Sequence, residues 1–268
     1  MIVNCTNVDE LVIGRLRSQN DQKQTYAGTF RGIKVAVKVL YQKGRDMHCQ
    51  KHGGYYKSCY YYPYLRMLYT IFLNKQLRHP GISNLLGYCV RDVHHPPLPE
   101  DAILKQGVIA VFESGDKFIM NNESSLSERL QFAYQLADVL DYLANSPIGS
   151  VHVGDFMPNN LETINGQLKI PDLENSYVLE PKCVVANETV ECPHRVECVD
   201  GICVGHNAKR MMEKAEQRFF SKWLMSTDST DLKYENDLAM LSLLLKEPST
   251  TAAKLKRAVK TVLKKIYK

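Results

Sequence analysis

No stretch of the 268-residue chain is an unbroken apolar run of the roughly 18 residues that indicate a membrane-spanning helix. The chain also lacks an internal repeat and a strong charge of either sign, because 34 basic and 29 acidic side chains leave a formal net charge of only +5. A balance this small does not predict nucleic-acid binding. The composition, 44% hydrophobic and 24% charged, excludes wholesale disorder, collagen and coiled coil, and predicts one large domain or two lobes.

The first residues, Met1–Asn4, have neither a basic flank nor an apolar stretch, so no signal peptide is visible in this chain. Other features nevertheless predict a secreted protein. Three N-x-[ST] sequons are candidate glycosylation sites, at Asn4, Asn122 and Asn187. The chain has eight cysteines, and their clustering favours disulfides in an oxidising compartment; the candidates are Cys49, Cys59, Cys183, Cys192, Cys198 and Cys203.

The pairing of the four cysteines between 183 and 203 stays open, because they admit three pairings among themselves or a bridge to Cys5 or Cys89. Zinc is an alternative to disulfides here. Cys192, Cys198 and Cys203 have two histidines nearby, His194 and His206. The segment has no C-x2-C pair, however, and structural zinc sites usually contain one.

Alternating apolar runs broken by turn residues predict strands in the first part of the chain, at 11–14, 25–30, 34–40, 83–89 and 107–112, with one helix at 63–77. The second part is helical. Ser125 and Glu128 form a predicted capping box, Asn207 is a predicted cap, and helices are expected at 125–143, 207–224, 231–246 and 250–267. This order predicts an α+β, bilobal fold. Its β-rich N-lobe spans 1–113 with a cysteine-containing insertion, and its helical C-lobe spans 114–268 with the Cys-rich segment 183–203.

Four polar side chains have an order and spacing suited to phosphoryl transfer. Lys38 ends the strand Val35-Ala36-Val37-Lys38. Asp155 is followed five residues later by Asn160, and Asp172 ends the segment Gly166–Asp172. Phosphoryl transfer needs a lysine at the nucleotide phosphates, a carboxylate that receives the proton of the attacking hydroxyl, and oxygen ligands for a divalent metal.

These segments resemble the protein kinase family, whose V-A-I-K, H-R-D-x-x-x-x-N and D-F-G motifs occur in the same order. Further segments resemble the vertebrate lonesome kinases, a family of secreted protein-tyrosine kinases; they are Tyr142–Val151, Asp155-Phe156-x-Pro158, Gly166–Leu173 and Gly201–Lys209. The resemblance implies a kinase fold, ATP with Mg²⁺ or Mn²⁺, and transfer to a hydroxyl, expected to be tyrosine, of a secretory or extracellular protein. It also implies that the chain itself is secreted or lies in the Golgi lumen.

The resemblance also implies a role for each matching position. Lys38 would contact the phosphates, Asp155 would be the catalytic base, and Asn160 and Asp172 would be metal ligands. Glu113 would lie at the hinge against the adenine, and Gly14 would begin the phosphate loop.

Two departures from the family pattern weaken the predicted nucleotide site. After Gly14 the expected glycines are missing, and Arg15–Gln24 is predicted to be a longer polar loop. The helix glutamate that pairs with the lysine is missing too; counting back from Pro80 reaches Thr70, and Asp46 is the sole acid between Lys38 and His79. Two hypotheses therefore stay open, an active kinase and a pseudokinase that acts as a binding or scaffold module.

Two smaller departures lie beside the predicted base. Val153-Gly154 stands where His-Arg usually precedes the catalytic aspartate, and Leu173-Glu174 follows Asp172 in place of Phe-Gly. The first removes an arginine that could bind an activation-loop phosphate. A Cys-stapled segment held in place without phosphorylation fits that loss.

The last twenty residues, 249–268, contain seven basic residues and no acidic one. Apolar residues at helical spacing accompany them. The segment is predicted to be either a surface for heparin-like polymers or anionic membranes, or the solvated face of a last helix that packs on the large lobe.

Overall fold

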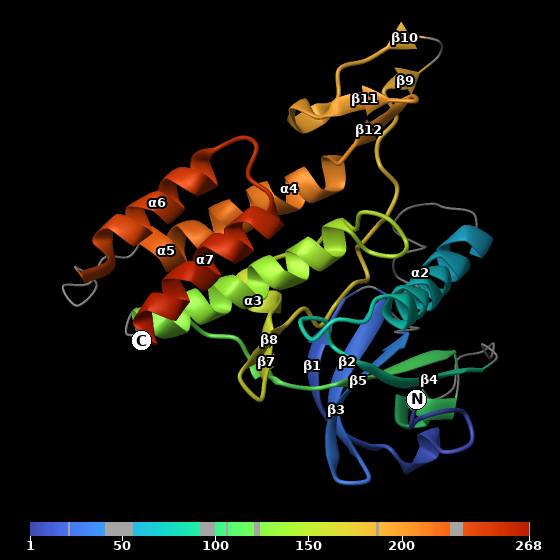
Figure 1. The fold of residues 1–268 in the computed structure, drawn as a ribbon. Coiled ribbons are helices and arrows are strands. Elements are labelled where there is room, and N and C mark those ends of the chain that lie inside the picture. The colour runs from blue at the N-terminus through green and yellow to red at the C-terminus, as the bar shows by residue number, and fades with distance from the viewer. Residues whose placement is uncertain are drawn as a thin grey trace. The chain divides into compact units, whose positions relative to one another are not determined.

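A computed structural model of the chain describes residues 1–20, 22–40, 56–91, 100–105, 107–120, 124–185, 188–225 and 233–267. It divides into two compact units (Figure 1). Unit 1 comprises Met1–Arg78 and Ser83–Asp116, and unit 2 comprises His79–Ile82 and Lys117–Lys268. The predicted α+β class, β-rich first and helical second, is confirmed. Within these described ranges, no helix is both long and apolar enough to cross a membrane.

Unit 1 is built on an antiparallel five-stranded sheet with the order β1-β2-β3-β5-β4. Its strands are β1 (Val12–Gln19), β2 (Lys23–Phe30), β3 (Ile33–Leu40), β4 (Leu85–Val90) and β5 (Val108–Glu113). Two short 3-10 helices, η1 (Val8–Glu10) and η2 (Glu100–Lys105), and one long helix, α2 (Tyr56–Gln76), complete it. The predicted helix start at Pro63 is wrong, because Pro63 lies inside α2.

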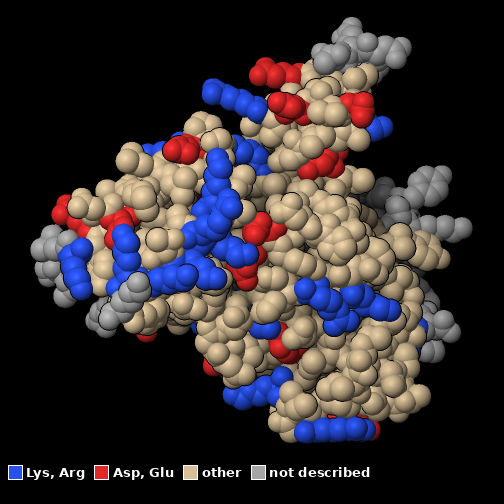
Figure 2. All heavy atoms as spheres, in the orientation of Figure 1, with Lys and Arg blue, Asp and Glu red and all other residues tan. Residues whose placement is uncertain are grey.

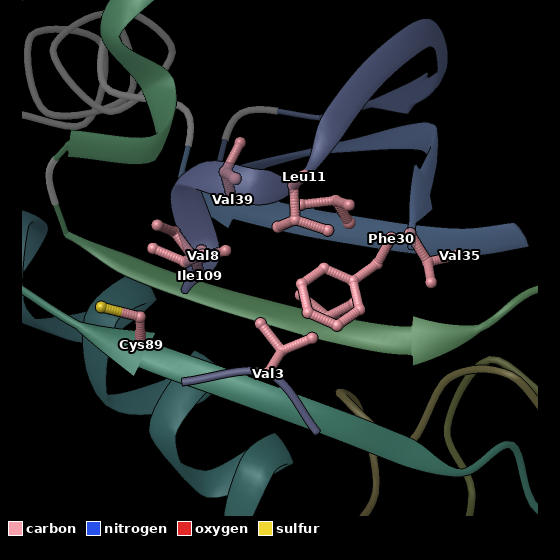
Figure 3. Packing of buried hydrophobic residues seen from close by; sticks show 10 residues of the cluster. Val3, Val8, Leu11, Phe30, Val35, Val39, Cys89 and Ile109 are labelled. Carbon is pink, nitrogen blue, oxygen red and sulfur yellow. The ribbon is translucent and has the colours of Figure 1, made fainter. Parts of the chain in front are cut away.

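Strand β3 is buried on both of its faces. Successive side chains of a strand point to opposite faces, and here Val35 and Val37 join a core cluster with the N-terminal segment. Figure 3 shows this cluster, with Val3, Phe30 and Val35 among its labelled residues. Ala36, between the two valines, instead joins a second cluster with residues of α2. The sheet therefore holds Lys38, near the end of β3, in a well-packed frame.

The N-terminal segment is fixed against β4 covalently and through its backbone. Cys5 and Cys89 form a disulfide, and the Ile2 N–H donates to the Leu86 carbonyl over 2.7 Å. A Cβ at Gly87 would stand 1.9 Å from the Val3 carbonyl oxygen, so only glycine fits this close approach.

Unit 2 is mainly helical. Its helices are α3 (Leu126–Ala144), α4 (His206–Ala215), the π-helical turn η5 (Glu216–Phe220), α5 (Ser221–Met225), α6 (Glu235–Lys246) and α7 (Ala252–Ile266). The capping box at the start of α3 is confirmed: the Ser125 hydroxyl accepts the Glu128 N–H, and the Glu128 carboxylate accepts the Ser125 N–H. α3 and α7 pack along each other.

The prediction that Asn207 caps a helix is wrong. The cap is Gly205, at φ +81°, a left-handed conformation that glycine adopts easily. Asn207 is fully buried inside the first turn of α4, where its amide donates to the Ser150 and Leu179 carbonyls. Its own N–H is accepted by the Glu180 carboxylate at 2.9 Å, so the helix start is stabilised from a distant part of the chain.

The remaining elements are short, and all but β6, which begins at Asp116 of unit 1, belong wholly to unit 2. A three-stranded sheet has the order β6-β7-β8; its strands are β6 (Asp116–Lys117), β7 (Glu162–Ile164) and β8 (Gln167–Lys169), and the 3-10 helix η3 (Pro158–Asn160) precedes β7. The Cys-rich segment holds the pairs β9 (Val184–Val185) with β10 (Glu188–Thr189) and β11 (Glu197–Val199) with β12 (Ile202–Val204), as well as η4 (Pro193–Arg195).

Two disulfides staple the Cys-rich segment, Cys183–Cys198 and Cys192–Cys203. Although Cys183, Cys192 and Cys203 lie within 4.8 Å of one another, their sulfurs are in disulfides and are not the thiolates that zinc requires. The zinc alternative is therefore wrong. The pair Cys49 and Cys59 and the sequons at Asn122 and Asn187 lie outside the described residues or side chains.

Candidate active site

Lys38 lies near the end of β3, the central strand of the sheet in unit 1, between Thr25 of β2 and Ala110 of β5. It is 5% exposed. Its ammonium group lies 4.7 Å from the centre of the Phe112 ring, within the range of a cation–π interaction. A lysine held this way by a packed sheet has a defined position, whereas the tip of a lysine on a solvent face is usually mobile.

The segment after Gly14 is not the predicted loop. β1 continues through Gln19 and β2 begins at Lys23, so most of Arg15–Gln24 is a hairpin. Glycine is nevertheless favoured at position 14, because a Cβ there would stand 2.9 Å from the Ala27 carbonyl oxygen. Glu113 ends β5, and its carboxylate accepts the Asn84 N–H at 2.9 Å and the Asn84 amide at 3.1 Å. Its side chain thus fixes the end of the strand.

In unit 2, Asp155 and Asn160 are brought together by one short turn. The Asn160 side-chain amide donates to the Asp155 carbonyl over 2.9 Å, and the N–H of Met157 donates to the same oxygen over 3.0 Å. Pro158 starts the 3-10 turn that ends at Asn160, where its missing N–H and fixed φ are favourable. The amide nitrogen of Asn160 is thereby committed as a donor, and its carbonyl oxygen is left to act as a ligand.

Asp172 begins a second turn that returns to Asp155. Its carboxylate accepts the Glu174 N–H at 2.9 Å, an Asx turn that fixes the chain just after β8. Three residues after Asp172, the side-chain amide of Asn175 donates to the Asp155 carboxylate. A Cβ at Gly154 would stand 2.4 Å from the Asn175 carbonyl oxygen, so only glycine fits before Asp155 in this packing.

Two cations from the helix after the Cys-rich segment hold the backbone before and after Asp155. The Lys214 ammonium donates to the Gly154 carbonyl at 3.1 Å and the Val153 carbonyl at 3.4 Å. Arg218 donates to the Phe156 carbonyl at 2.6 Å. Lys214 lies in the last turn of α4 and Arg218 lies in the π-helical turn; such turns are frequent at functional sites. Burial lowers the pKa of Lys214, and the nearby Arg210 and Arg218 lower it further.

His152 connects this helix to the loop. Its Nε2 lies 3.0 Å from the Lys214 ammonium, and its ring stacks on Tyr177 at 4.5 Å. Tyr177 is itself bridged to His152 through two backbone hydrogen bonds. Burial, with the charges of Lys214 and Arg210, lowers the pKa of His152 to about 3, so the imidazole is neutral and accepts from Lys214 through Nε2.

Sequence reasoning missed four of these residues: His152, Asn175, Lys214 and Arg218. The spacing of Asn175, three residues after Asp172, was a signal available in the sequence. Lys214 and Arg218, four residues apart on one face of a helix, gave no such signal, because a cationic pair at this spacing most often faces solvent.

The oxygen donors of unit 2 fit a hard divalent cation. Asp172 supplies a carboxylate and Asn160 supplies an amide oxygen, the ligand types that Mg²⁺ prefers. In the part of the chain that the structure describes, the Asn160 amide oxygen and one Asp155 carboxylate oxygen accept no hydrogen bond. These side chains are therefore of the chemical types that ligate a divalent cation and accept a proton from a hydroxyl.

No protein-family model matches the chain. The chain is similar to human extracellular tyrosine-protein kinase PKDCC, with 31% identity over 196 residues. The similarity covers 71% of this chain and 38% of the human protein, so the chain matches well under half the length of that relative.

Proposed function

From the resemblance of this chain to the family of extracellular tyrosine-protein kinases, we propose that it is a protein kinase domain that transfers the γ-phosphate of ATP to the hydroxyl of a protein, specifically a tyrosine. One observation carries the proposal. Asp155, Asn160 and Asn175 are joined by hydrogen bonds into one polar unit, and Asp172 starts the turn that carries Asn175.

Each residue of that unit has a role in the proposed reaction. Asn175 holds one carboxylate oxygen of Asp155, and the other oxygen receives the proton of the attacking hydroxyl. Lys214 and Arg218 fix the backbone carbonyls on both sides of Asp155, so the carboxylate keeps its direction. Because a general base must lie within hydrogen-bond reach of its proton, this fixed direction is what catalysis requires.

Asp172 and Asn160 would hold Mg²⁺ or Mn²⁺, and Lys38 would contact the α and β phosphates of ATP, with the backbone at Gly14 and Glu113 along the nucleotide. The metal, when bound, neutralises charge that develops on the transferring phosphoryl group. The burial of Lys38 within the sheet supports its assignment, because a buried ammonium needs a strong functional or structural reason.

A titration with ATP and Mg²⁺, followed by thermal unfolding, tests nucleotide binding. A ligand at 100 times its Kd adds about 2.7 kcal/mol of stability, so a clear rise in Tm is expected. The matched variant is Asp172→Asn, which keeps the size of the side chain and its acceptor for the Glu174 N–H but weakens metal binding. If ATP and Mg²⁺ leave the Tm of both proteins unchanged, the proposed nucleotide binding is contradicted.

A second candidate, a pseudokinase that acts as a binding or scaffold module, is favoured by α2. This helix contains no Asp or Glu in its sequence. Thr70, at the position where the family glutamate is expected, is buried and its hydroxyl donates to the Arg66 carbonyl within the helix. An ATP-dependent rise in Tm without phosphate transfer to a tyrosine-containing acceptor would select this candidate.

The compartment of the proposed kinase is the secretory pathway or the extracellular space, with a protein substrate from the same place. Three disulfides support it, since such bonds persist where the environment is oxidising. Asn4 is exposed and sits in a sequon, as a glycosylated residue must. Peptide mapping without reduction tests this; free thiols at the six paired cysteines would contradict it.

A further inference from the structure

Helix α7 has a strongly basic composition that the proposed kinase reaction does not use. Its fifteen residues include no acidic side chain. Six are basic: Lys254, Lys256, Arg257, Lys260, Lys264 and Lys265. Figure 2 shows Lys and Arg side chains gathered over α7, on the face of unit 2 turned toward the viewer.

Two of the six cations are neutralised inside the unit. Lys256 pairs with Asp138 at 2.7 Å and Asp141 at 3.2 Å, and its hydrogen bond to Asp138 raises its pKa. Lys265 pairs with Asp237 at 2.6 Å. These pairs join α7 to its neighbours, α3 and α6, and so contribute to the fold rather than to an outward-facing charge.

The other four cations, Lys254, Arg257, Lys260 and Lys264, are exposed. Among residues that the structure describes, none of the four has an acidic partner. At 3.6 residues per turn, positions 257, 260 and 264 fall within about 60° of the helix circumference and span about 10 Å along its axis. We call these four residues the α7 cationic face.

The α7 cationic face borders a groove between α3 and α7. The groove has a volume of about 420 Å³. It is lined by Gln131, Tyr134, Lys260, Leu263, Lys264 and Tyr267. The surface of the groove is mainly apolar, from the two tyrosine rings, Leu263 and the aliphatic stems of the two lysines. Flat apolar contact beside cationic residues suits a sugar bearing anionic groups.

An anionic membrane is the poorer match for this surface. A helix that binds at a membrane interface buries its apolar side among the lipids. In α7 that side is already used, because Leu255, Val259 and Val262 are fully buried in the core of unit 2. The exposed side of α7 carries the four cations of the α7 cationic face in a row along the helix, an arrangement that matches a linear polyanion.

We propose that the α7 cationic face binds a sulfated glycosaminoglycan chain. The three disulfides indicate an oxidising compartment, where the linear polyanions a protein meets are sulfated polysaccharides rather than nucleic acids. This binding does not depend on phosphoryl transfer, so the proposal is tested independently of the proposed kinase activity.

The test compares two variants with the same net charge. The first replaces Lys254, Arg257, Lys260 and Lys264 with Gln; the control replaces four exposed basic residues elsewhere, Lys34, Lys117, Lys182 and Lys222, with Gln. Binding to heparin is measured over a series of NaCl concentrations. Charges beyond about 8 Å are largely screened at 0.15 M salt, so only cations that touch the polymer matter.

The α7 variant is expected to bind heparin about tenfold or more weakly than the control variant at 0.15 M NaCl. Its slope of log Kd against log salt should be smaller by about 3, from roughly 0.7–0.9 per lost contact by analogy with DNA. Equal affinity of the two variants, or wild-type protein that does not bind heparin at that salt, would overturn the proposal.

A vesicle arm separates the polymer from a membrane. Wild-type protein is expected not to co-sediment at 0.15 M NaCl with vesicles that contain anionic lipid. Co-sedimentation that is lost in the α7 variant would overturn the choice of a polysaccharide. Fluorescence of Trp223, the one tryptophan of the chain, which is buried in unit 2, verifies that both variants are folded.

Discussion

The neutral, buried His152 predicts that unit 2 loses stability in mild acid. The folded state holds the pKa of His152 at about 3, whereas an unfolded chain gives histidine its ordinary value near 6.5. The unfolded state therefore binds more protons, so stability is lost as the pH falls below about 6.5 and continues to fall until about pH 3. The groups that face the ring are cationic or neutral: Lys214, Arg210, His194 and His206.

The magnitude follows from the linkage relation. At pH 5 the unfolded imidazole is almost fully protonated and the folded one is almost fully neutral. Between pH 7 and pH 5 this difference costs about 2 kcal/mol of unfolding free energy.

The assay is urea unfolding followed by the fluorescence of Trp223, which reports on the unit that contains His152. The comparison is with His152→Gln, whose amide oxygen can accept from Lys214 and which does not titrate. Burial also lowers the pKa values of His79 and His206. Those residues are present in both proteins, so their contribution cancels in the comparison.

The wild type should lose about 2 kcal/mol more than the variant between pH 7 and pH 5, whatever the variant costs at pH 7. If the two proteins lose stability in parallel, His152 is not held neutral by its surroundings. The link between Lys214, His152 and the loop that carries Asp155 would then have to be abandoned.

Three further changes have defined outcomes. Replacing Cys5 and Cys89 with Ala opens a loop with a sequence separation of 84 and should cost about 4–5 kcal/mol of unfolding free energy by the loop-entropy relation, measured by urea unfolding with circular dichroism; a loss below about 1 kcal/mol would refute it. Asn175→Leu removes the hydrogen bond to the Asp155 carboxylate and should lower kcat about tenfold or more. The ATP-dependent rise in Tm should persist in this variant. An unchanged kcat would contradict the proposed positioning role of Asn175. Ser125→Ala removes the cap of α3 and should lower the free energy of unfolding by about 1 kcal/mol, measured by urea unfolding with Trp223 fluorescence. An unchanged free energy of unfolding would contradict the capping role of Ser125.

Local sequence signals predicted those parts of the fold that depend on local chemistry. The capping box of Ser125 and Glu128 is present because both partners lie within one helical turn. The apolar residues Met211, Ala215, Phe219 and Trp223 recur every four positions, the spacing of one helix face, and all four are buried. In contrast, the start of α4 depends on Glu180, and the burial of Asn207 depends on Ser150 and Leu179. The local sequence pattern does not predict contacts with partners that lie this far away along the chain.

The candidate site divides in the same way. The spacing of Asp155 and Asn160 reflects a hydrogen bond inside one short turn, so the sequence predicts their pairing. The contacts of Lys214 and Arg218 with the loop join residues about sixty positions apart, and only the folded chain brings them together. The expected loop after Gly14 was wrong because missing glycines and many polar residues also suit a hairpin that faces solvent.

The proposed kinase activity is measured as transfer of labelled phosphate from ATP to a tyrosine-containing peptide, with Mg²⁺ or Mn²⁺, by wild type and by Asp155→Asn. This substitution keeps the size of the side chain but removes the proposed base. We expect transfer by the wild type, a loss of about a hundredfold or more in the variant, and an ATP-dependent rise in Tm in both. Equal transfer by the two proteins, or no transfer by the wild type, would contradict the proposal.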